Sequence, residues 1–446
     1  MTKINTNKKL FGTDGIRSTY GKFPLEDPEI IHLGNILGIW AKEKYGKTPS
    51  VLIGWDTRES SDFICIFLGL GLSLEGIKVY TSYIVPTPAI AHMVQHDTRF
   101  DFGIMITASH NPYQDNGIKI IDKKTGKISK TDEAKITELF FSEPDNPFTE
   151  DDHGIHEISE EIEKKYIDTI TNYFEKDFLK NTKIVLDCAH GATFEIAPKI
   201  FKKLGAQIIT MANEPDGTNI NKNCGSTHPE ELQKAVLKHK ADIGFAFDGD
   251  GDRITVISKN GKIKDGDDIV CLLSEHPMYN KQKDIVGTIM SNYGLELHLA
   301  NKEKKLIRTN VGDKHIAKKM KEKNLLLGAE QSGHIILGDY LLSGDGIFAA
   351  LRICETIKLT GNSELKTFHK SPQIKINIPV KEKKDLTNNP YADIITKHNN
   401  MLENGRLIVR YSGTENVLRI TAEAQESKIA EDICAKISKK LEKELT

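Results

Sequence analysis

The stretch that decides the fold is Asp242–Arg253, with the sequence DIGFAFDGDGDR. Its first six residues form a short apolar run, which is typical of a strand buried in a sheet covered by helices. The run ends at three carboxylates, Asp248, Asp250 and Asp252, which are separated by two glycines. Polar loops at the ends of buried strands are where α/β proteins place their ligands. We therefore expect an α/β fold with a site at the end of this strand.

Apolar runs and helix-like stretches alternate in both directions from this strand. Apolar runs favour strands at 50–54, 77–81, 103–107, 183–187, 207–211 and 285–289. The pattern favours helices at 60–74, 194–204, 267–274 and 295–301 and a long helix after Gly344. Beyond His369 it changes to strands at 373–378 and 405–410 and a closing helix at 427–444. We expect three similar mixed-sheet α/β domains and a smaller C-terminal α+β domain, arranged around a central cleft.

The expected domain boundaries follow from where the alternation restarts. Ser142–Gly154 is polar and holds two prolines, which indicates a linker. The expected domains are 1–154, 155–256, 257–369 and 370–446.

Composition excludes several classes of protein. A chain of 446 residues suits two to four domains at roughly 100–200 residues each. The net charge of -2 gives no basic excess for binding nucleic acid. The most apolar stretch, Phe63–Leu74, is shorter than the roughly 20 residues that span a membrane, and the first residues lack the apolar run of a signal peptide. Six cysteines without a C-x-x-C pair indicate reduced thiols, so we expect a cytoplasmic protein.

The three-aspartate loop favours a divalent cation. Its carboxylates repel one another unless a cation neutralises them, and hard oxygen ligands suit Mg²⁺ or Ca²⁺. A calcium EF-hand shares the acidic spacing, but Arg253 and Lys259 stand where it needs Gly and Glu. The structural alternative is a solvated acidic turn, which does not normally end a buried strand. Arg253 beside the carboxylates suggests a phosphoryl group shared between cation and guanidinium.

A second motif, Thr107–Pro112 (TASHNP), follows the expected strand at 103–107. It places the hydroxyl of Ser109 at a strand end, with the polar side chains of His110 and Asn111 beside it. Taken alone, this motif favours a serine turn that merely caps the next helix.

Two further motifs have chemistry that suits a phosphosugar. In Arg410–Asn416 (RYSGTEN), the arginine can grip a phosphate with two hydrogen bonds, and Gly413 lets backbone N–H groups approach an anion. In Gly328–His334 (GAEQSGH), a carboxylate, an amide, a hydroxyl and an imidazole suit sugar hydroxyls, which both donate and accept. The structural alternatives are a β-turn and a polar loop with an ordinary histidine.

All four motifs, in this order and at domain-sized separations, resemble those of the α-D-phosphohexomutase superfamily over nearly the whole chain. Within it the chain is most similar to bacterial phosphoglucosamine mutases. The alternative is the phosphomannomutase/phosphoglucomutase branch, which typically has Met in place of Gln331 and His in place of Asp313. The stretches that carry the closer resemblance are FGTDGIR (11–17), NGIK (116–119), MSNYGLE (290–296) and NVGDK (310–314).

The resemblance implies a role for individual residues. It makes Ser109 a phosphoserine whose phosphate binds one Mg²⁺ per active site together with Asp248, Asp250 and Asp252. The residues implied around the transferred phosphoryl group are Arg17, His110, Lys119 and Arg253. Those implied to bind the sugar are Glu330, Ser332 and His334, and those implied to hold the second phosphate are Arg410, Ser412, Gly413 and Thr414. The candidates for general acid and base are Lys119 and Asp313.

Two positions depart from the family's pattern. Ser18 stands where Gly often follows the GIR triplet, and Asn416 stands where Pro often follows the Thr-Glu pair. Neither change removes a charged group.

The reaction implied is the interconversion of glucosamine 6-phosphate and glucosamine 1-phosphate through a hexosamine 1,6-bisphosphate. It would supply amino-sugar precursors for UDP-N-acetylglucosamine and the cell wall, with the last domain closing as a lid over the intermediate. A homodimer is compatible with this reading. Two other hypotheses remain: a metal-dependent phosphatase that uses the same serine, and a catalytically silent sugar-phosphate-binding protein.

Overall fold

The computed structural model describes residues 9–12, 14–46, 48–124, 126–142, 154–412 and 416–445. The chain divides into two compact units, one within 1–280 and 312–366, the other within 281–311 and 367–446. The expected linker at 142–154 lies almost entirely outside the described residues.

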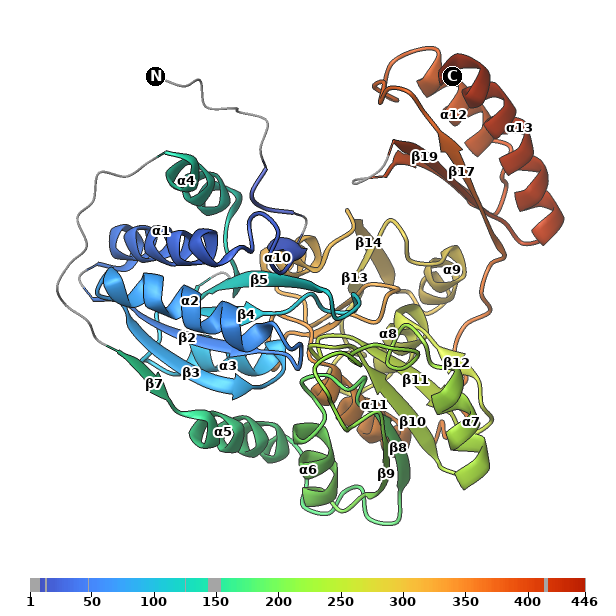
Figure 1. Ribbon diagram of the computed structural model, residues 1–446. Helices are drawn as coiled ribbons and strands as arrows, with labels where there is room; N and C mark the ends of the chain where they lie inside the picture. Colours follow the sequence, from blue (N-terminus) through green and yellow to red (C-terminus); the bar gives the residue numbers. More distant parts are fainter. Residues whose placement is uncertain are drawn as a thin grey trace. The chain divides into compact units, whose positions relative to one another are not determined.

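The first unit begins with a mixed sheet in the order β1-β5-β4-β2-β3-β7, with β6 paired to β5. Ile90 of α3 packs against Gly54 and Gly103, so α3 covers one face (Figure 1). Because neighbouring residues of a strand point to opposite faces, Ile53 and Ile104 face the other side, in a core shared with α1, α2 and α4. The strands are β1 (Ile16–Thr19), β2 (Ser50–Trp55), β3 (Lys78–Ile84), β4 (Phe102–Ile106), β5 (Asp115–Asp122), β6 (Gly126–Lys127) and β7 (Ile155–Glu157). The helices are α1 (Asp27–Tyr45), α2 (Ser61–Leu74), α3 (Thr87–His96) and α4 (Lys130–Phe141).

The helices α1 and α2 touch through glycine. A Cβ on Gly34 would lie 2.4 Å from the Leu68 carbonyl oxygen, and one on Gly71 would lie 2.1 Å from that of Ile31. Neither position has room for a side chain, so the two backbones are in direct contact. The opposite side of α2 carries large apolar side chains that are exposed, namely Phe63, Ile66 and Leu70.

A second sheet in the first unit has the order β12-β11-β10-β8-β9. The strands β8, β9 and β10 are parallel, and β10 forms a hairpin with β11 in which Phe247 pairs with Ile254. The acidic stretch at 248–253 is therefore the loop of a hairpin that starts from a central buried strand. The elements are α5 (Ser159–Asn172), β8 (Lys183–Asp187), α6 (Ile196–Lys203), β9 (Gln207–Met211), α7 (Glu230–His239), β10 (Ile243–Phe247), β11 (Ile254–Ser258) and β12 (Ile263–Lys264).

The rest of the first unit contains a second hairpin that carries a motif. In it β15 and β16 pair antiparallel, with Ala329 opposite Ile335, so residues 330–334 form the connecting loop. The elements are α8 (Gly266–Leu273), α10 (Asp313–Lys323), β15 (Leu327–Ala329), β16 (Ile335–Leu337) and α11 (Gly346–Thr360).

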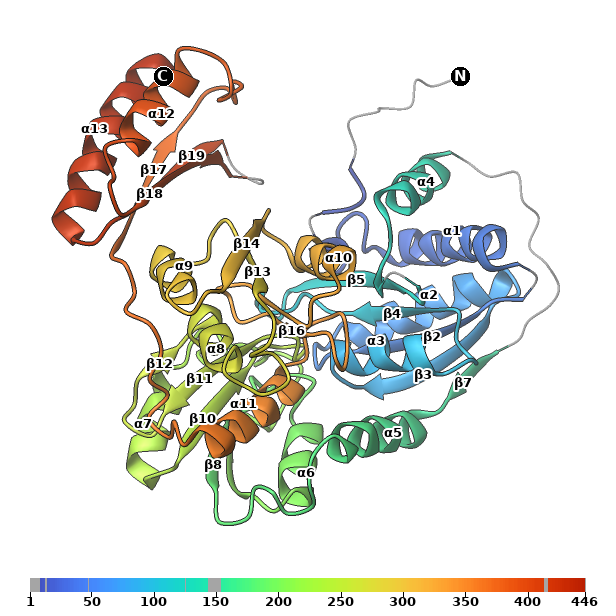
Figure 2. The same cartoon turned by 180° about the vertical axis from the view of Figure 1, so that it is seen from behind.

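The second unit combines a parallel strand pair with a small α+β domain. A three-stranded antiparallel sheet in the order β17-β19-β18 has α12 and α13 packed on one face (Figure 2). The sequence pattern beyond His369 predicted this change from alternating strands and helices to a small α+β domain. The elements are β13 (Asp284–Thr288), α9 (Tyr293–Ala300), β14 (Lys305–Thr309), β17 (Gln373–Pro379), α12 (Tyr391–Asn399), β18 (Arg406–Tyr411), β19 (Val417–Glu423) and α13 (Ser427–Leu445).

The six cysteines lie in the interior of the protein. All six are buried free thiols, and burial raises the pKa of Cys65, Cys224 and Cys354 to about 12. Within the described part of the chain, none of the helices combines the length and the apolarity that crossing a bilayer requires.

Candidate active site

Ser109 lies in a turn just after β4 and has a φ of 54°, in the left-handed region that side-chain-bearing residues rarely adopt. Its N–H donates to Thr107 Oγ1 over 2.8 Å. The buried guanidinium of Arg58 donates through Nη2 to the carbonyl oxygens of Ser109 (3.0 Å) and Asn111 (2.9 Å). Asn221 Nδ2 also donates to the Ser109 carbonyl, over 2.9 Å. Strained backbone persists where its surroundings over-determine it, and such residues cluster at active sites.

The serine turn touches the acidic hairpin loop directly. Ser109 Oγ donates to Asp248 Oδ2 over 2.7 Å. A Cβ on Gly249 would lie 2.5 Å from the Ser109 carbonyl oxygen, so this close approach requires glycine. The structure thus brings the first two motifs together.

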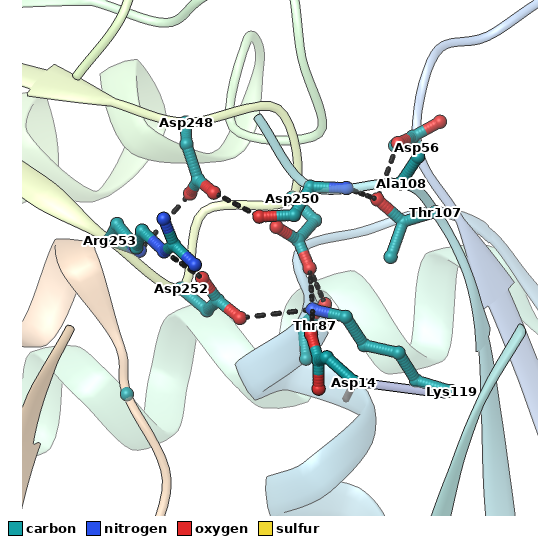
Figure 3. Close-up of polar contacts among 12 residues, drawn as sticks. Asp14, Asp56, Thr87, Thr107, Ala108, Lys119, Asp248, Asp250, Asp252 and Arg253 are labelled. Atoms are coloured by element: carbon teal, nitrogen blue, oxygen red, sulfur yellow. Dashed lines mark hydrogen bonds and ion pairs between the residues drawn. The ribbon is translucent and has the colours of Figure 1, made fainter. Parts of the chain in front are cut away.

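Lys119, from β5, reaches between two carboxylates of the loop (Figure 3). Its Nζ lies 2.6 Å from Asp250 Oδ2 and 3.1 Å from Asp252 Oδ2. Burial opposes its charge, but the carboxylates outweigh burial and raise the pKa of Lys119 well above its usual value. Burial, and then the charges of Asp252 and Asp250, raise the pKa of Asp248 to about 8. Buried carboxylates this close together disfavour one another's charge, which a bound cation would relieve.

The three aspartates fit a divalent cation. One ligand oxygen from each lies within 4.8 Å of the others, and all three residues are buried. Oδ1 of Asp250 and Oδ1 of Asp252 are buried without a hydrogen-bond donor. Buried polar atoms are normally satisfied, and carboxylate oxygens without a hydrogen-bond donor are available to Mg²⁺, which prefers oxygen ligands.

The residues expected around the transferred group surround Ser109. Arg17 Nη1 donates to the Ala108 carbonyl over 3.0 Å, and His110 Nδ1 lies 3.3 Å from Ser109 Oγ. Burial, and then the charges of Arg253 and Arg17, lower the pKa of His110 to about 4, so its imidazole is neutral at physiological pH. The Arg253 backbone N–H donates to Asp248 Oδ1 over 3.1 Å.

The loop at 330–334 lies beside the acidic loop, since Arg253 and His334 form an isolated β-bridge. Glu330 is buried, and its Oε1 accepts from the Gly312 N–H over 2.8 Å. Ser332 is exposed. His334 is buried, with Nδ1 3.6 Å from Asp252 Oδ1 and Nε2 3.4 Å from a carboxylate oxygen of Asp313. Burial lowers the pKa of His334, but these two carboxylates outweigh it and raise the pKa to about 9.

Several residues at the site were missed by the sequence analysis. Arg58 follows β2, which is parallel to the serine-bearing strand β4, so its position at the same sheet edge was the available signal. Asp14 and Lys127 were also missed; they pair with each other, and Lys127 Nζ lies 2.7 Å from Asp313, which was already a candidate acid or base. Nothing in the sequence near Asn221 indicates its contact with the serine turn.

The fourth motif begins in the second unit, where Arg410 and Tyr411 end β18. Arg410 pairs across the strands with Arg419, and burial together with that like charge lowers the pKa of Arg410. Lys383 Nζ donates to the Ser412 carbonyl over 2.8 Å. Like charges directly opposite each other destabilise a sheet, so an anion bound here would relieve the repulsion. Gly413 and Thr414 lie outside the described residues. Arg419 is a further cation that the motif alone did not reveal.

Sequence models of the phosphoglucomutase/phosphomannomutase family match four successive parts of the chain. Its alpha/beta/alpha domains I, II and III match residues 8–147, 164–261 and 265–373, and its C-terminal domain matches residues 376–440. A phosphoglucosamine mutase from Campylobacter curvus is 39% identical over 436 residues, covering 95% of this chain and 96% of the relative. One from Campylobacter jejuni is 40% identical over 446 residues, with the same coverage. The chain belongs to the phosphoglucosamine mutase family.

Solved structures agree with the fold of this mutase family. A phosphoglucomutase/phosphomannomutase family protein from Burkholderia thailandensis superposes with a TM-score of 0.79 at 22% identity, covering 96% of this chain and 95% of that one. N-acetylphosphoglucosamine mutase from Aspergillus fumigatus, solved with GlcNAc-6P and magnesium, gives a TM-score of 0.70 at 17% identity, with 99% and 97% coverage. The expected three α/β domains and C-terminal domain are thereby confirmed, and membership of the family makes the chain an isomerase.

Proposed function

We propose that this mutase interconverts glucosamine 6-phosphate and glucosamine 1-phosphate through phospho-Ser109 and a hexosamine 1,6-bisphosphate. This activity would supply amino sugar for UDP-N-acetylglucosamine and cell-wall synthesis. The observation that carries the proposal is the 2.7 Å contact between Ser109 Oγ and Asp248, made by a serine in a strained and heavily anchored turn. The relatives at about 40% identity supply the substrate.

The residues around Ser109 position the transferred phosphoryl group and neutralise its charge. Ser109 gives its phosphoryl group to the free sugar hydroxyl, and the second phosphate of the resulting bisphosphate later returns to Ser109. A Mg²⁺ ion held by Asp248, Asp250, Asp252 and the phosphoserine would supply positive charge to the phosphoryl oxygens. The remaining positive charge and hydrogen-bond donors come from Arg17, His110, Lys119 and Arg253.

The remaining motifs hold the rest of the substrate. Glu330 and Ser332 bind sugar hydroxyls. The burial of His334 between Asp252 and Asp313 favours a role in orienting those carboxylates over direct contact with the sugar. The phosphate that is not transferred binds to Arg410, Ser412, Gly413 and Thr414, with Arg419 as a second guanidinium.

Neither candidate general acid or base has a pKa near neutrality in this arrangement. Carboxylates keep Lys119 charged. Burial raises the pKa of Asp313, but Lys127 and His334 outweigh burial and lower it. A proton-transfer role for either residue therefore requires substrate to break these ion pairs.

We further propose that the protein is a cytoplasmic homodimer. The free buried cysteines support a reducing compartment. Phe63, Ile66 and Leu70 are 53%, 56% and 43% exposed and form one stripe on α2, which could meet its own copy across a two-fold axis. Light scattering on the wild type and on a Phe63→Ser/Ile66→Ser variant tests this. A monomeric wild type, or a variant that stays dimeric, contradicts it.

A coupled assay with glucosamine, glucose and mannose phosphates tests the activity. We expect the highest kcat/KM with glucosamine phosphate, and a preference for either other sugar would overturn the substrate assignment.

Arg410→Ala should lose mutase turnover, whereas full turnover would favour a phosphatase. Intact-mass analysis after incubation with the bisphosphate should show one phosphoryl group, absent from Ser109→Ala. A wild type that never acquires it would instead be a silent binding protein.

A further inference from the structure

The stretch Met290–Glu296 has no role in the proposed mechanism, yet it holds the start of the C-terminal domain. The side chain of Asn292, which is buried, pairs in both directions with the backbone of Ser371. Its Nδ2 donates to the Ser371 carbonyl over 3.1 Å, and its Oδ1 accepts from the Ser371 N–H over 2.9 Å. A Cβ on Gly294 would lie 2.2 Å from the His369 carbonyl oxygen. The chain is therefore fixed against the start of α9 immediately before it enters β17.

A second attachment joins the same stretch to the sheet of the C-terminal domain. Arg406, the first residue of β18, donates through Nη1 to the Ile289 carbonyl over 2.8 Å and through Nη2 to the Ser291 carbonyl. Its Nε donates to the carboxylate of Glu423, a fully buried residue of β19. Asn292 Nδ2 lies 3.3 Å from that carboxylate. One arginine thus connects two strands to the turn after β13.

We propose that Arg406, Glu423 and Asn292 form a latch that positions Arg410 of the phosphate-binding motif. Arg406 and Arg410 lie four residues apart on β18, and side chains at even spacing share one face of a strand. Their cross-strand partners on β19 are Glu423 and Arg419. Fixing Arg406 to the turn after β13 therefore fixes the direction of the strand that carries Arg410. Arg406 is a positioning residue, because its guanidinium binds Glu423 and the carbonyl oxygens of Ile289 and Ser291.

The inference rests on the proposed function and extends it to the fate of the intermediate. When phospho-Ser109 has passed its phosphoryl group to the sugar, Ser109 has a free hydroxyl and both phosphates are on the bisphosphate. A loosely held phosphate site would release that bisphosphate before the second transfer. The enzyme would then remain dephosphorylated until added hexosamine 1,6-bisphosphate returned a phosphoryl group to Ser109.

The test is an activity titration of Arg406→Gln with added hexosamine 1,6-bisphosphate. We expect the half-activating concentration to rise by about 10- to 100-fold, the scale on which displaced positioning groups affect turnover, with kcat at saturating bisphosphate near that of the wild type. The matched control is Arg352→Gln, which removes a buried arginine that pairs with Asp339 at 2.8 Å in the first unit. The control should lower the melting temperature without raising the bisphosphate requirement.

A double variant separates stability from positioning. Arg406→Gln leaves the buried Glu423 carboxylate without its ionic partner, which destabilises a protein. Arg406→Gln/Glu423→Gln removes that charge as well, so its melting temperature should recover while its raised bisphosphate requirement persists. A requirement equal to that of the wild type in both variants would show that Arg406 acts on stability alone and would overturn the latch.

Hydrogen exchange tests the latch independently of activity. Backbone amides of β18, Ser371 and Gln373 should exchange faster in Arg406→Gln than in the wild type, and unchanged exchange would contradict the proposal. A wild type that turns over no hexose phosphate would overturn the proposed function instead, while the exchange experiment would still decide whether the latch exists.

Discussion

At the scale of single residues, the serine turn depends on a buried arginine behind it. The guanidinium of Arg58 binds carbonyl oxygens of the turn and pairs with Asp56 at 2.9 Å. Arg58→Lys keeps the charge but loses the planar fork that reaches several carbonyls at once. We expect kcat to fall by about 10- to 100-fold because Ser109 is displaced. Stopped reactions analysed by intact mass should show slower phosphorylation of Ser109.

A second arginine of the same domain provides a control that separates the role of Arg58 from the general effect of replacing arginine by lysine. Arg99 forms exposed ion pairs with Asp97 and Glu161, and pairs of this kind contribute little to stability. Arg99→Lys should therefore leave both kcat and phosphorylation unchanged. Equal effects of the two substitutions would mean that Arg58 has no special role.

The aspartate loop predicts a stabilising effect of magnesium. A ligand that binds only the folded state stabilises it by about 2.7 kcal/mol at a concentration 100 times its Kd. We expect Mg²⁺ to raise the melting temperature of the wild type and to have little effect on Asp250→Asn. Removal of the ion with a chelator should abolish turnover, and re-addition should restore it. If Mg²⁺ leaves the melting temperature of the wild type unchanged, the assignment of the aspartate loop as a metal site is contradicted.

The three aspartates of the site were recognisable in the sequence, but the residues that hold the serine turn in place were not. The three aspartates stood out because carboxylates so closely spaced after a buried strand repel one another unless a cation joins them. Arg58 and Asn221 act on carbonyl oxygens, and a contact to backbone leaves no pattern in the sequence. The burial of His334 was equally invisible, because a polar loop gives no indication of which side chain turns inward.

At the scale of elements, the pair formed by α1 and α2 requires glycine at its crossing. Alanine normally favours a helix over glycine by up to about 1 kcal/mol. Gly71→Ala should nevertheless destabilise the protein, since its Cβ would lie 2.1 Å from the Ile31 carbonyl oxygen. Overpacking of this kind costs about 1–3 kcal/mol, which urea unfolding would measure. A stabilised variant would show that the helices separate readily.

The strands were predicted more accurately than their exact ends. The expected strands at 103–107 and 405–410 are observed at Phe102–Ile106 and Arg406–Tyr411. Continuous apolar runs locate buried strands well because both faces need apolar side chains. The expected helix at 194–204 is shorter, at Ile196–Lys203, because its ends depend on turns and capping contacts rather than on apolar pattern.

At the scale of the whole molecule, stability should fall in mild acid because of a buried histidine. His92 of α3 stacks on His96, with ring centroids 4.1 Å apart, and on Tyr340 at 5.4 Å. Burial, and then the charge of His96, lower the pKa of His92 to about 4. Below pH 6.5 the imidazole of His92 binds a proton in the unfolded chain, whereas in the folded protein it binds one only below about pH 4. This linkage costs about 3 kcal/mol as the pH falls through that window.

Urea unfolding at pH 7 and at pH 4.5 measures this loss. His92→Phe keeps a ring in the stack but cannot titrate, so its stability should fall less between the two pH values. His239→Phe, at the exposed end of α7, is the control and should behave like the wild type. An unchanged pH dependence in His92→Phe would exclude this histidine as the cause.

The buried cysteines make this protein a convenient host for spectroscopic labels. A thiol whose pKa is about 12 and which is buried does not react with maleimides or nitroxide reagents at neutral pH. A single cysteine introduced on α5 and another on α13 would therefore be labelled selectively, without first removing natural thiols. Distances between two such labels, measured with and without bisphosphate, would test the expected closure of the C-terminal domain in the otherwise unaltered enzyme.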